Sequence, residues 1–147
     1  MDPKSVKNRP DLKAVQLKRT CHAMDNAFAE ANVTGYKNLL AELELPDKDD
    51  RHVLAIAIKS GADTIITFNK KDFPARNLKL YGIDCKDPDE FIGPLLKSNL
   101  SRVLVAFERL VNALKNPPQS KEQVLNTLEN CGLKESIIVI RTVAMAL

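Results

Sequence analysis

The sequence predicts an α/β fold, in which helices flank a parallel sheet and an all-helical extension follows at the C-terminus. Residues 53–58 form an apolar run of good helix formers, and Gly61 stands where helices commonly end. Residues 64–67 are β-branched throughout, which is typical of a strand buried on both faces. A second short strand is expected at residues 83–85, and this helix–strand order favours parallel pairing.

Three elements are expected before this central part. A first helix is indicated by apolar residues that recur at helical spacing, namely Leu17, Cys21, Met24 and Phe28. Asp11 is a candidate for the N-cap of that helix. Residues 31–33 favour a short strand, and residues 36–43 favour a short helix. That helix should stop before Pro46, because the residue preceding a proline avoids the helical region.

The C-terminal part predicts helices only. Residues 88–96 favour one helix, and a strong apolar stripe then predicts another, formed by Leu100, Val103, Leu104, Phe107, Leu110, Val111 and Leu114. Ser120 and Gln123 have the spacing of a capping box, and Gly132 should end the helix that they begin. Residues 139–147 predict a last helix. We therefore expect a domain over residues 1–98 and a helical extension over residues 99–147.

Composition restricts the classes of function. The net charge of +3 permits contact with an acidic polymer without requiring it. The absence of Trp argues against recognition of bases by aromatic stacking platforms. Three cysteines without zinc-site spacing favour free thiols in a reducing cytoplasm. No apolar run approaches the roughly 20 residues of a membrane span, so we expect a soluble, cytoplasmic protein without a membrane partner.

Acidic side chains gather around the helix–strand unit. Asp47, Asp49 and Asp50 precede the helix at residues 53–58, whereas Asn69 and Asp72 follow the strand at residues 64–67. A helix that leads into a parallel strand runs antiparallel to it, so its first residues lie at the carboxyl end of that strand. Ligands of open α/β sheets bind at this end. We therefore expect the two groups of acids to converge.

Converging carboxylates repel one another unless a cation neutralises them, and hard oxygen ligands suit Mg²⁺ or Mn²⁺. Such an ion can activate water and stabilise the charge that builds at phosphorus during phosphodiester cleavage. The expected catalytic residues are Asp49, Asp50 and Asp72, and Asn69 joins them as a candidate metal ligand. The candidates for contact with a nucleic-acid backbone are Arg51, Lys70 and Lys71.

Simpler roles remain open for these residues. Asp49 or Asp50 could serve as a helix N-cap, because carboxylates are favoured near the positive end of a helix. The three basic side chains, taken singly, are more often solvated surface charges. His52 lies on the first turn of the helix and is expected to have a structural role.

The sequence around these acids resembles that of PIN-domain proteins, in particular the VapC-like toxins of VapBC-type toxin–antitoxin pairs. The resemblance is carried by residues 45–55 and 66–74, joined by Gly61-Ala62-Asp63. It extends to shorter segments along nearly the whole chain, at residues 8–12, 33–36, 88–91 and 116–118.

The resemblance implies a metal-dependent ribonuclease, with RNA as substrate and an antitoxin-like protein as partner. Family members gather three or four acids around one or two Mg²⁺ or Mn²⁺ ions. Asp50 falls on the third acid of the family, with Asp49 as its neighbour. Asn69 holds the position of the fourth acid, and Asp72 is expected to replace it as a ligand.

The chain departs from the family at its beginning. Complete members begin with a strand that ends in an Asp and a helical segment that carries a Glu, and neither has a counterpart upstream of Asn8. We therefore expect a truncated PIN-like sheet that holds its cation weakly and is inactive as a ribonuclease alone. The alternative is a catalytically dead module that binds a protein or RNA.

The same departure predicts a homo-oligomer. Without a first strand, residues 64–67 would present an open edge, which is a template for another chain. Apolar side chains such as Leu39, Leu40, Ile56 and Ile58 would be left bare, and large bare patches are rare on monomers. We therefore expect a two-fold dimer, with the stripe of residues 100–114 as the element most ready to exchange. The alternative is a monomer in which that stripe folds back onto its own chain.

Overall fold

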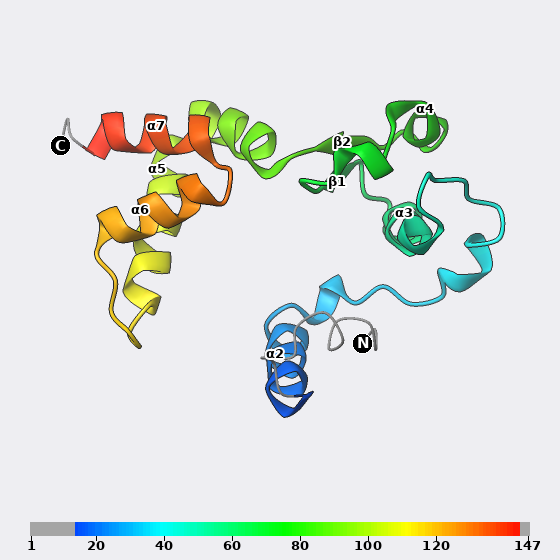
Figure 1. Cartoon of the computed structure of the whole chain (residues 1–147), viewed down its shortest axis with the longest axis horizontal. Coiled ribbons are helices and arrows are strands. Elements are labelled where there is room, and N and C mark those ends of the chain that lie inside the picture. The colour runs from blue at the N-terminus through cyan, green and yellow to red at the C-terminus, as the bar shows by residue number, and fades with distance from the viewer. Residues whose placement is uncertain (1–13, 145–147) are drawn as a thin grey trace.

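The computed structural model describes residues 14–144 and confirms the α/β fold class. Within these residues a two-stranded parallel sheet lies with short helices around it, and a helical part follows at the C-terminal side. Figure 1 shows these two parts side by side, with α5, α6 and α7 gathered on one side of the strands. Each part has a hydrophobic cluster of its own.

The central helix–strand unit forms as expected. Helix α3 spans Arg51–Ser60, and Gly61 ends it with a φ of 69°, a conformation that a residue with a Cβ rarely adopts. Strand β1, Thr64–Ile66, pairs in parallel with β2, Asp84–Lys86, so that Ile65 stands opposite Cys85. The connection between the strands contains the short helix α4, Ala75–Leu78.

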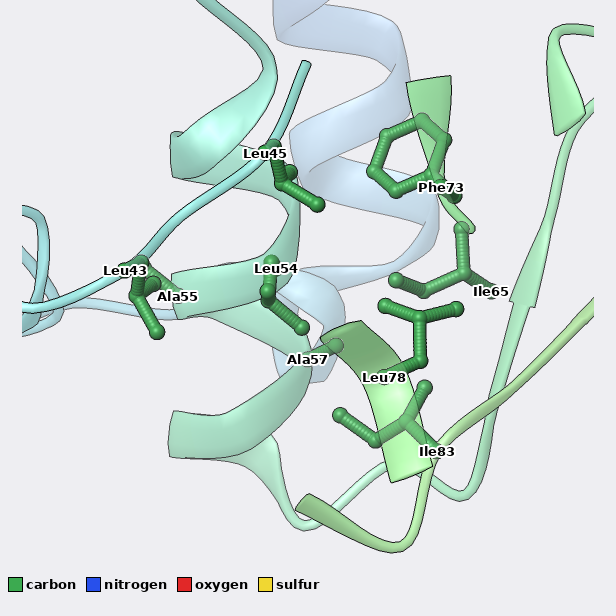
Figure 2. Packing of buried hydrophobic residues seen from close by; sticks show 9 residues of the cluster. All are labelled: Leu43, Leu45, Leu54, Ala55, Ala57, Ile65, Phe73, Leu78 and Ile83. Atoms are coloured by element: carbon green, nitrogen blue, oxygen red, sulfur yellow. The ribbon is translucent and has the colours of Figure 1, made fainter. Parts of the chain in front are cut away.

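The first hydrophobic cluster lies between α3, the strands and α4 (Figure 2). Its buried members are Leu43, Leu45, Leu54, Ala55, Ala57, Ile65, Phe73, Leu78 and Ile83. Leu39, Leu40 and Ile58 pack against this cluster in part, so these three are not the bare surface that the sequence predicted. The expectation of a strand buried on both faces is wrong for β1, because Ile66 is 46% exposed.

The segment before this unit differs from the sequence prediction. Helix α2, Ala14–Ala27, forms where the apolar stripe indicated it, and the expected cap at Asp11 lies outside the described residues. The strand predicted at residues 31–33 is absent from the structure, which has a 3₁₀ turn at Ala29–Ala31 instead. A β-branched residue such as Val33 favours a strand only where a neighbouring strand can pair with it.

The helix predicted at residues 36–43 is reduced to the 3₁₀ turn Lys37–Leu39. This segment crosses the edge of the first cluster, where Tyr36 and Leu40 are half-buried and Leu43 is fully buried. Packing of these separate side chains requires a bent path, which overrides the weak helical preference of so short a segment.

The C-terminal part consists of three helices. Helix α5, Pro88–Ala113, is interrupted at Asn99, whose φ and ψ of −142° and 45° are not helical, so the two predicted helices form one kinked element. Helix α6, Lys121–Asn130, begins with the predicted capping box of Ser120 and Gln123. Helix α7, Lys134–Ala144, begins well before residue 139, where the sequence analysis placed it.

These helices enclose the second hydrophobic cluster. Its buried members are Leu96, Phe107, Val124, Leu125, Ile137 and Ile140. Most of the predicted stripe on α5 packs against them within the same chain, whereas Leu110 remains 43% exposed. Leu96 precedes the domain boundary predicted between residues 98 and 99, and that boundary stays a prediction. None of the helices within residues 14–144 combines the length and the apolar character needed to cross a membrane.

Candidate functional site

Three aspartates meet where α3 begins and β1 ends. Asp47, Asp50 and Asp72 each place a carboxylate oxygen so that these oxygens lie within 4.8 Å of one another. Asp47 is exposed, and the other two are half-buried. The first two residues precede α3, and Asp72 lies in the loop after β1, so the antiparallel course of helix and strand brings them together.

The 3₁₀ turn Lys48–Asp50 explains why Asp47, and not Asp49, joins this group. Asp47 is the N-cap of this turn and folds its carboxylate back toward the backbone N–H of Asp49, which brings that carboxylate close to Asp50 at the end of the turn. The exposed Asp49 lies outside the group. Sequence reasoning left Asp47 out of the site, and its spacing of three residues from Asp50 is the signal that could have identified it.

Capping of this turn is a task of Asp47. Its Oδ1 accepts a hydrogen bond of 2.8 Å from the backbone N–H of Asp49, whereas the Asp50 side chain makes no capping hydrogen bond to α3. His52 lies on the exposed first turn, where its Nδ1 is 2.6 Å from the backbone oxygen of Asp49. The Asp50 carboxylate is therefore available for another role.

Asn69 acts on Asp72. The Nδ2 of Asn69 donates a short hydrogen bond to Oδ2 of Asp72, and the backbone N–H of Asn69 donates to Oγ1 of Thr67 at 3.1 Å. Asp72 itself closes the 3₁₀ turn Lys70–Asp72. This geometry fixes one oxygen of the Asp72 carboxylate through the amide and leaves the other for a ligand.

Electrostatics at the site are those of crowded carboxylates. Burial raises the pKa of Asp50, and the charges of Asp47 and Asp72 raise it further. His52 acts in the opposite direction, and Asp49 adds a smaller repulsion. The shift shows that the acids repel one another, which a bound cation would relieve.

The donor set fits a hard divalent cation. Carboxylate oxygens are the ligands that Mg²⁺ and Mn²⁺ prefer. At roughly 2.1 Å per Mg–O contact, oxygens on opposite sides of the ion stand about 4.2 Å apart. The observed limit of 4.8 Å is close enough for small side-chain rotations to close the site.

The three basic candidates have different surroundings. Arg51 is half-buried, and its Nε is buried without a hydrogen-bond partner. The Nζ of Lys70 is 2.7 Å from both carboxylate oxygens of Glu90, so it faces α5. Lys71 is exposed. Of the three basic candidates, Lys70 is the one that takes part in an ion pair among the described residues, whereas Arg51 and Lys71 are in none of the ion pairs described there.

Comparison with known proteins gives two matches. The family model described as VapC50 C-terminal domain matches residues 88–142. A Mycobacterium tuberculosis protein described as "Putative ribonuclease VapC50" is 34% identical over 103 residues, which are 70% of this chain and 60% of the mycobacterial protein. Both matches bear out the resemblance of the chain to VapC-like PIN-domain proteins.

Within that family, both matches relate the chain to VapC50 in particular. The chain spans about 60% of the length of this relative. No solved structure gives a match.

Proposed function

We propose that Asp50 and Asp72, with Asp47 beside them, hold Mg²⁺ or Mn²⁺ as part of the active site of a VapC-type ribonuclease. The observation that carries this proposal is the approach of the three carboxylate oxygens to within 4.8 Å. The name of the mycobacterial relative supports RNA as the substrate. It also supports membership of a toxin–antitoxin pair, with an antitoxin-like protein as partner.

Each residue of the site has a distinct task in this proposal. Asp50 and Asp72 supply the oxygens, and Asn69 orients Asp72. The exposed Lys71 is placed to contact the phosphate backbone of RNA. When bound, the cation supplies an activated water and stabilises the negative charge that develops at phosphorus.

The same geometry favours low activity in this chain alone. Asp47 already uses one carboxylate oxygen to cap its turn, so only its other oxygen can bind a cation, and two carboxylates remain without a competing backbone task. A site with few charged ligands binds Mg²⁺ or Mn²⁺ weakly and keeps several waters on the ion. The second candidate function, a binding module without catalysis, is favoured by this commitment of Asp47.

Calorimetry with Mn²⁺ tests the proposal. We expect weak binding by the chain, and we expect Asp50→Asn or Asp72→Asn to lower the affinity at least about tenfold, because each replaces a charged carboxylate ligand by a neutral amide. Asp49→Asn is the matched control, since it removes an equal charge from the same turn but outside the group, and it should change the affinity much less.

Cleavage of RNA in Mn²⁺ completes this test. We expect the wild-type chain to cut structured and single-stranded RNA no faster than Asp50→Ala does. Cleavage that requires Asp50 would show that the chain is active alone. Absence of any Mn²⁺ binding would contradict the metal site and favour the binding module.

A further inference from the structure

The loop that carries Asn69 and Asp72 is attached to the C-terminal helices at two points. The first is the ion pair of Lys70 with Glu90, in which Nζ lies 2.7 Å from Oε1 and Oε2. Asp87 adds a longer contact of 3.8 Å. The hydrogen bond with Glu90 raises the pKa of Lys70 and lowers that of Glu90, so both groups are charged at neutral pH.

The second attachment is the contact between Phe68 and Gly132. A Cβ atom placed on Gly132 would lie 2.9 Å from Cε1 of the Phe68 ring, so the ring occupies space that only a glycine leaves free. Gly132 also has a φ of 108°, which side chains rarely tolerate. Phe68 and Lys70 thus hold the loop on either side of Asn69.

The two attachment points are linked to each other through Asp89. Glu90 lies in the first turn of α5, and Gly132 lies just before α7. Oδ2 of Asp89 accepts from the backbone N–H of Glu135 at 2.8 Å, and Oδ1 accepts from that of Ser136 at 2.9 Å. Asp89 therefore ties the start of α5 to the start of α7, which fixes Glu90 and Gly132 relative to each other.

We propose that the C-terminal helices position Asp72 through these attachments, with Lys70 and Glu90 as positioning residues for the acidic site. This inference rests on the proposed function, because it assigns positioning residues to that same site. Asn69 stands between the two attachment points and donates to Asp72. Movement of the loop away from α5 would therefore move the Asp72 carboxylate away from Asp50.

Simple electrostatics makes the opposite prediction for Lys70. Removal of a positive charge beside carboxylates strengthens cation binding, because one repulsion is lost. If Lys70 positions the loop, its removal weakens cation binding instead. The direction of the change in Mn²⁺ affinity therefore separates positioning from a charge effect.

The size of the effect is limited by the exposure of the pair. The side chains of Lys70 and Glu90 are 41% and 48% exposed, and pairs of this kind contribute little to folding. The variants should therefore remain folded. The weakness of an exposed pair limits the expected loss of Mn²⁺ affinity to about two- to fivefold.

The experiment measures Mn²⁺ affinity by calorimetry in the full chain. Lys70→Met and Glu90→Gln should each weaken Mn²⁺ binding. The double variant should bind Mn²⁺ with the same affinity as Lys70→Met alone, because both substitutions remove the same ion pair. Gln at residue 90 keeps the capping box of α5. Lys70→Arg should retain the wild-type affinity. Lys71→Met removes an equal charge from the same loop and should leave the affinity unchanged or raise it.

Hydrogen exchange without metal gives an independent measurement. The amides of Asp72 and Phe73 donate within the loop, to the backbone oxygens of Asn69 and Lys70. They should exchange two- to fivefold faster in Lys70→Met and at the wild-type rate in Lys71→Met. Unchanged exchange, or Mn²⁺ affinity in Lys70→Met equal to or above that of the wild type, would overturn the inference.

The two measurements also separate this inference from the proposed function. If the wild-type chain binds no Mn²⁺, the proposed metal site fails. Faster exchange in Lys70→Met would then still support the attachment of the loop, and unchanged exchange would overturn both ideas.

Discussion

At the scale of single residues, the acidic site lowers the stability of the fold that carries it. Burial and the charges of Asp47 and Asp72 raise the pKa of Asp50 in the folded state. Between its unfolded and folded pKa the folded chain binds more protons than the unfolded chain, so stability falls as pH rises through this window. The ionised Asp50 therefore lowers the stability of the folded chain at neutral pH when no cation is bound.

Asp50→Asn should therefore stabilise the metal-free chain at pH 7, by on the order of 0.5 kcal/mol, the usual size of an exposed charge interaction. The gain should vanish near pH 3, where the carboxyl is protonated in both states. Urea unfolding at the two pH values measures the difference, with Asp84→Asn on the exposed side of β2 as the control. A loss of stability at pH 7 would contradict this account.

The candidate site was open to prediction only in part. Asp50 and Asp72 stand out in the sequence because they flank a recognisable helix and strand. Asp47 was grouped with the acids at the helix start but was not assigned to the site, because which of these acids approaches Asp50 depends on the geometry of the turn, which composition does not specify. The partner of Lys70 is equally hidden, because Glu90 lies 20 residues away in the sequence.

At the scale of elements, the sequence predicted a helix boundary correctly where the cap is a neighbour in the sequence, and incorrectly where the cap comes from a distant residue. The start of α6 is set by Ser120 and Gln123, which are neighbours in the sequence, and the prediction there is confirmed. The start of α7 was placed too late, because the carboxylate that accepts from its first N–H groups belongs to Asp89, 46 residues before Glu135. A cap supplied by another helix leaves no local pattern.

Asp89→Ala should lower the free energy of unfolding by about 1–2 kcal/mol, the range for loss of a helix cap. Burial opposes ionisation of this carboxyl, yet the interactions with Ser136 and the backbone at Glu135 outweigh it and lower the pKa. Stability from a lowered pKa is present at neutral pH and is lost as pH falls through the folded value.

The difference between wild type and Asp89→Ala in urea unfolding should therefore shrink below about pH 4. Asp89→Asn, which keeps one acceptor oxygen, should show a smaller loss at pH 7. An equal difference at pH 7 and pH 3 would show that the charge of Asp89 has no part in the cap.

At the scale of the whole molecule, apolar side chains on and just after α2, and in and just after β1, lie at the surface. Met24 and Phe28 are 60% and 67% exposed, and Ile66 and Phe68 are 46% and 58% exposed. The stripe on α5, which the sequence analysis considered most ready to exchange between chains, packs on α6 and α7 of its own chain instead. The expected homo-dimer stays a prediction, and α2 is now the element best placed to form it.

Light scattering over a dilution series should give twice the mass of the chain at high concentration. Met24→Lys with Phe28→Lys should shift the population toward the monomer, because charges on a buried apolar face are costly. Leu80→Lys is the control, since Leu80 is 80% exposed and lies on the 3₁₀ turn Lys79–Tyr81. A compact monomer at every concentration would contradict the dimer.

The separate hydrophobic clusters have a consequence for spectroscopy. The chain has no Trp, and its two tyrosines, Tyr36 and Tyr81, both lie in the part that contains the first cluster. Far-ultraviolet ellipticity, by contrast, is dominated by α5, α6 and α7 around the second cluster. Tyrosine fluorescence and ellipticity thus report on different parts, and their melting curves coincide only if both clusters unfold in one cooperative step.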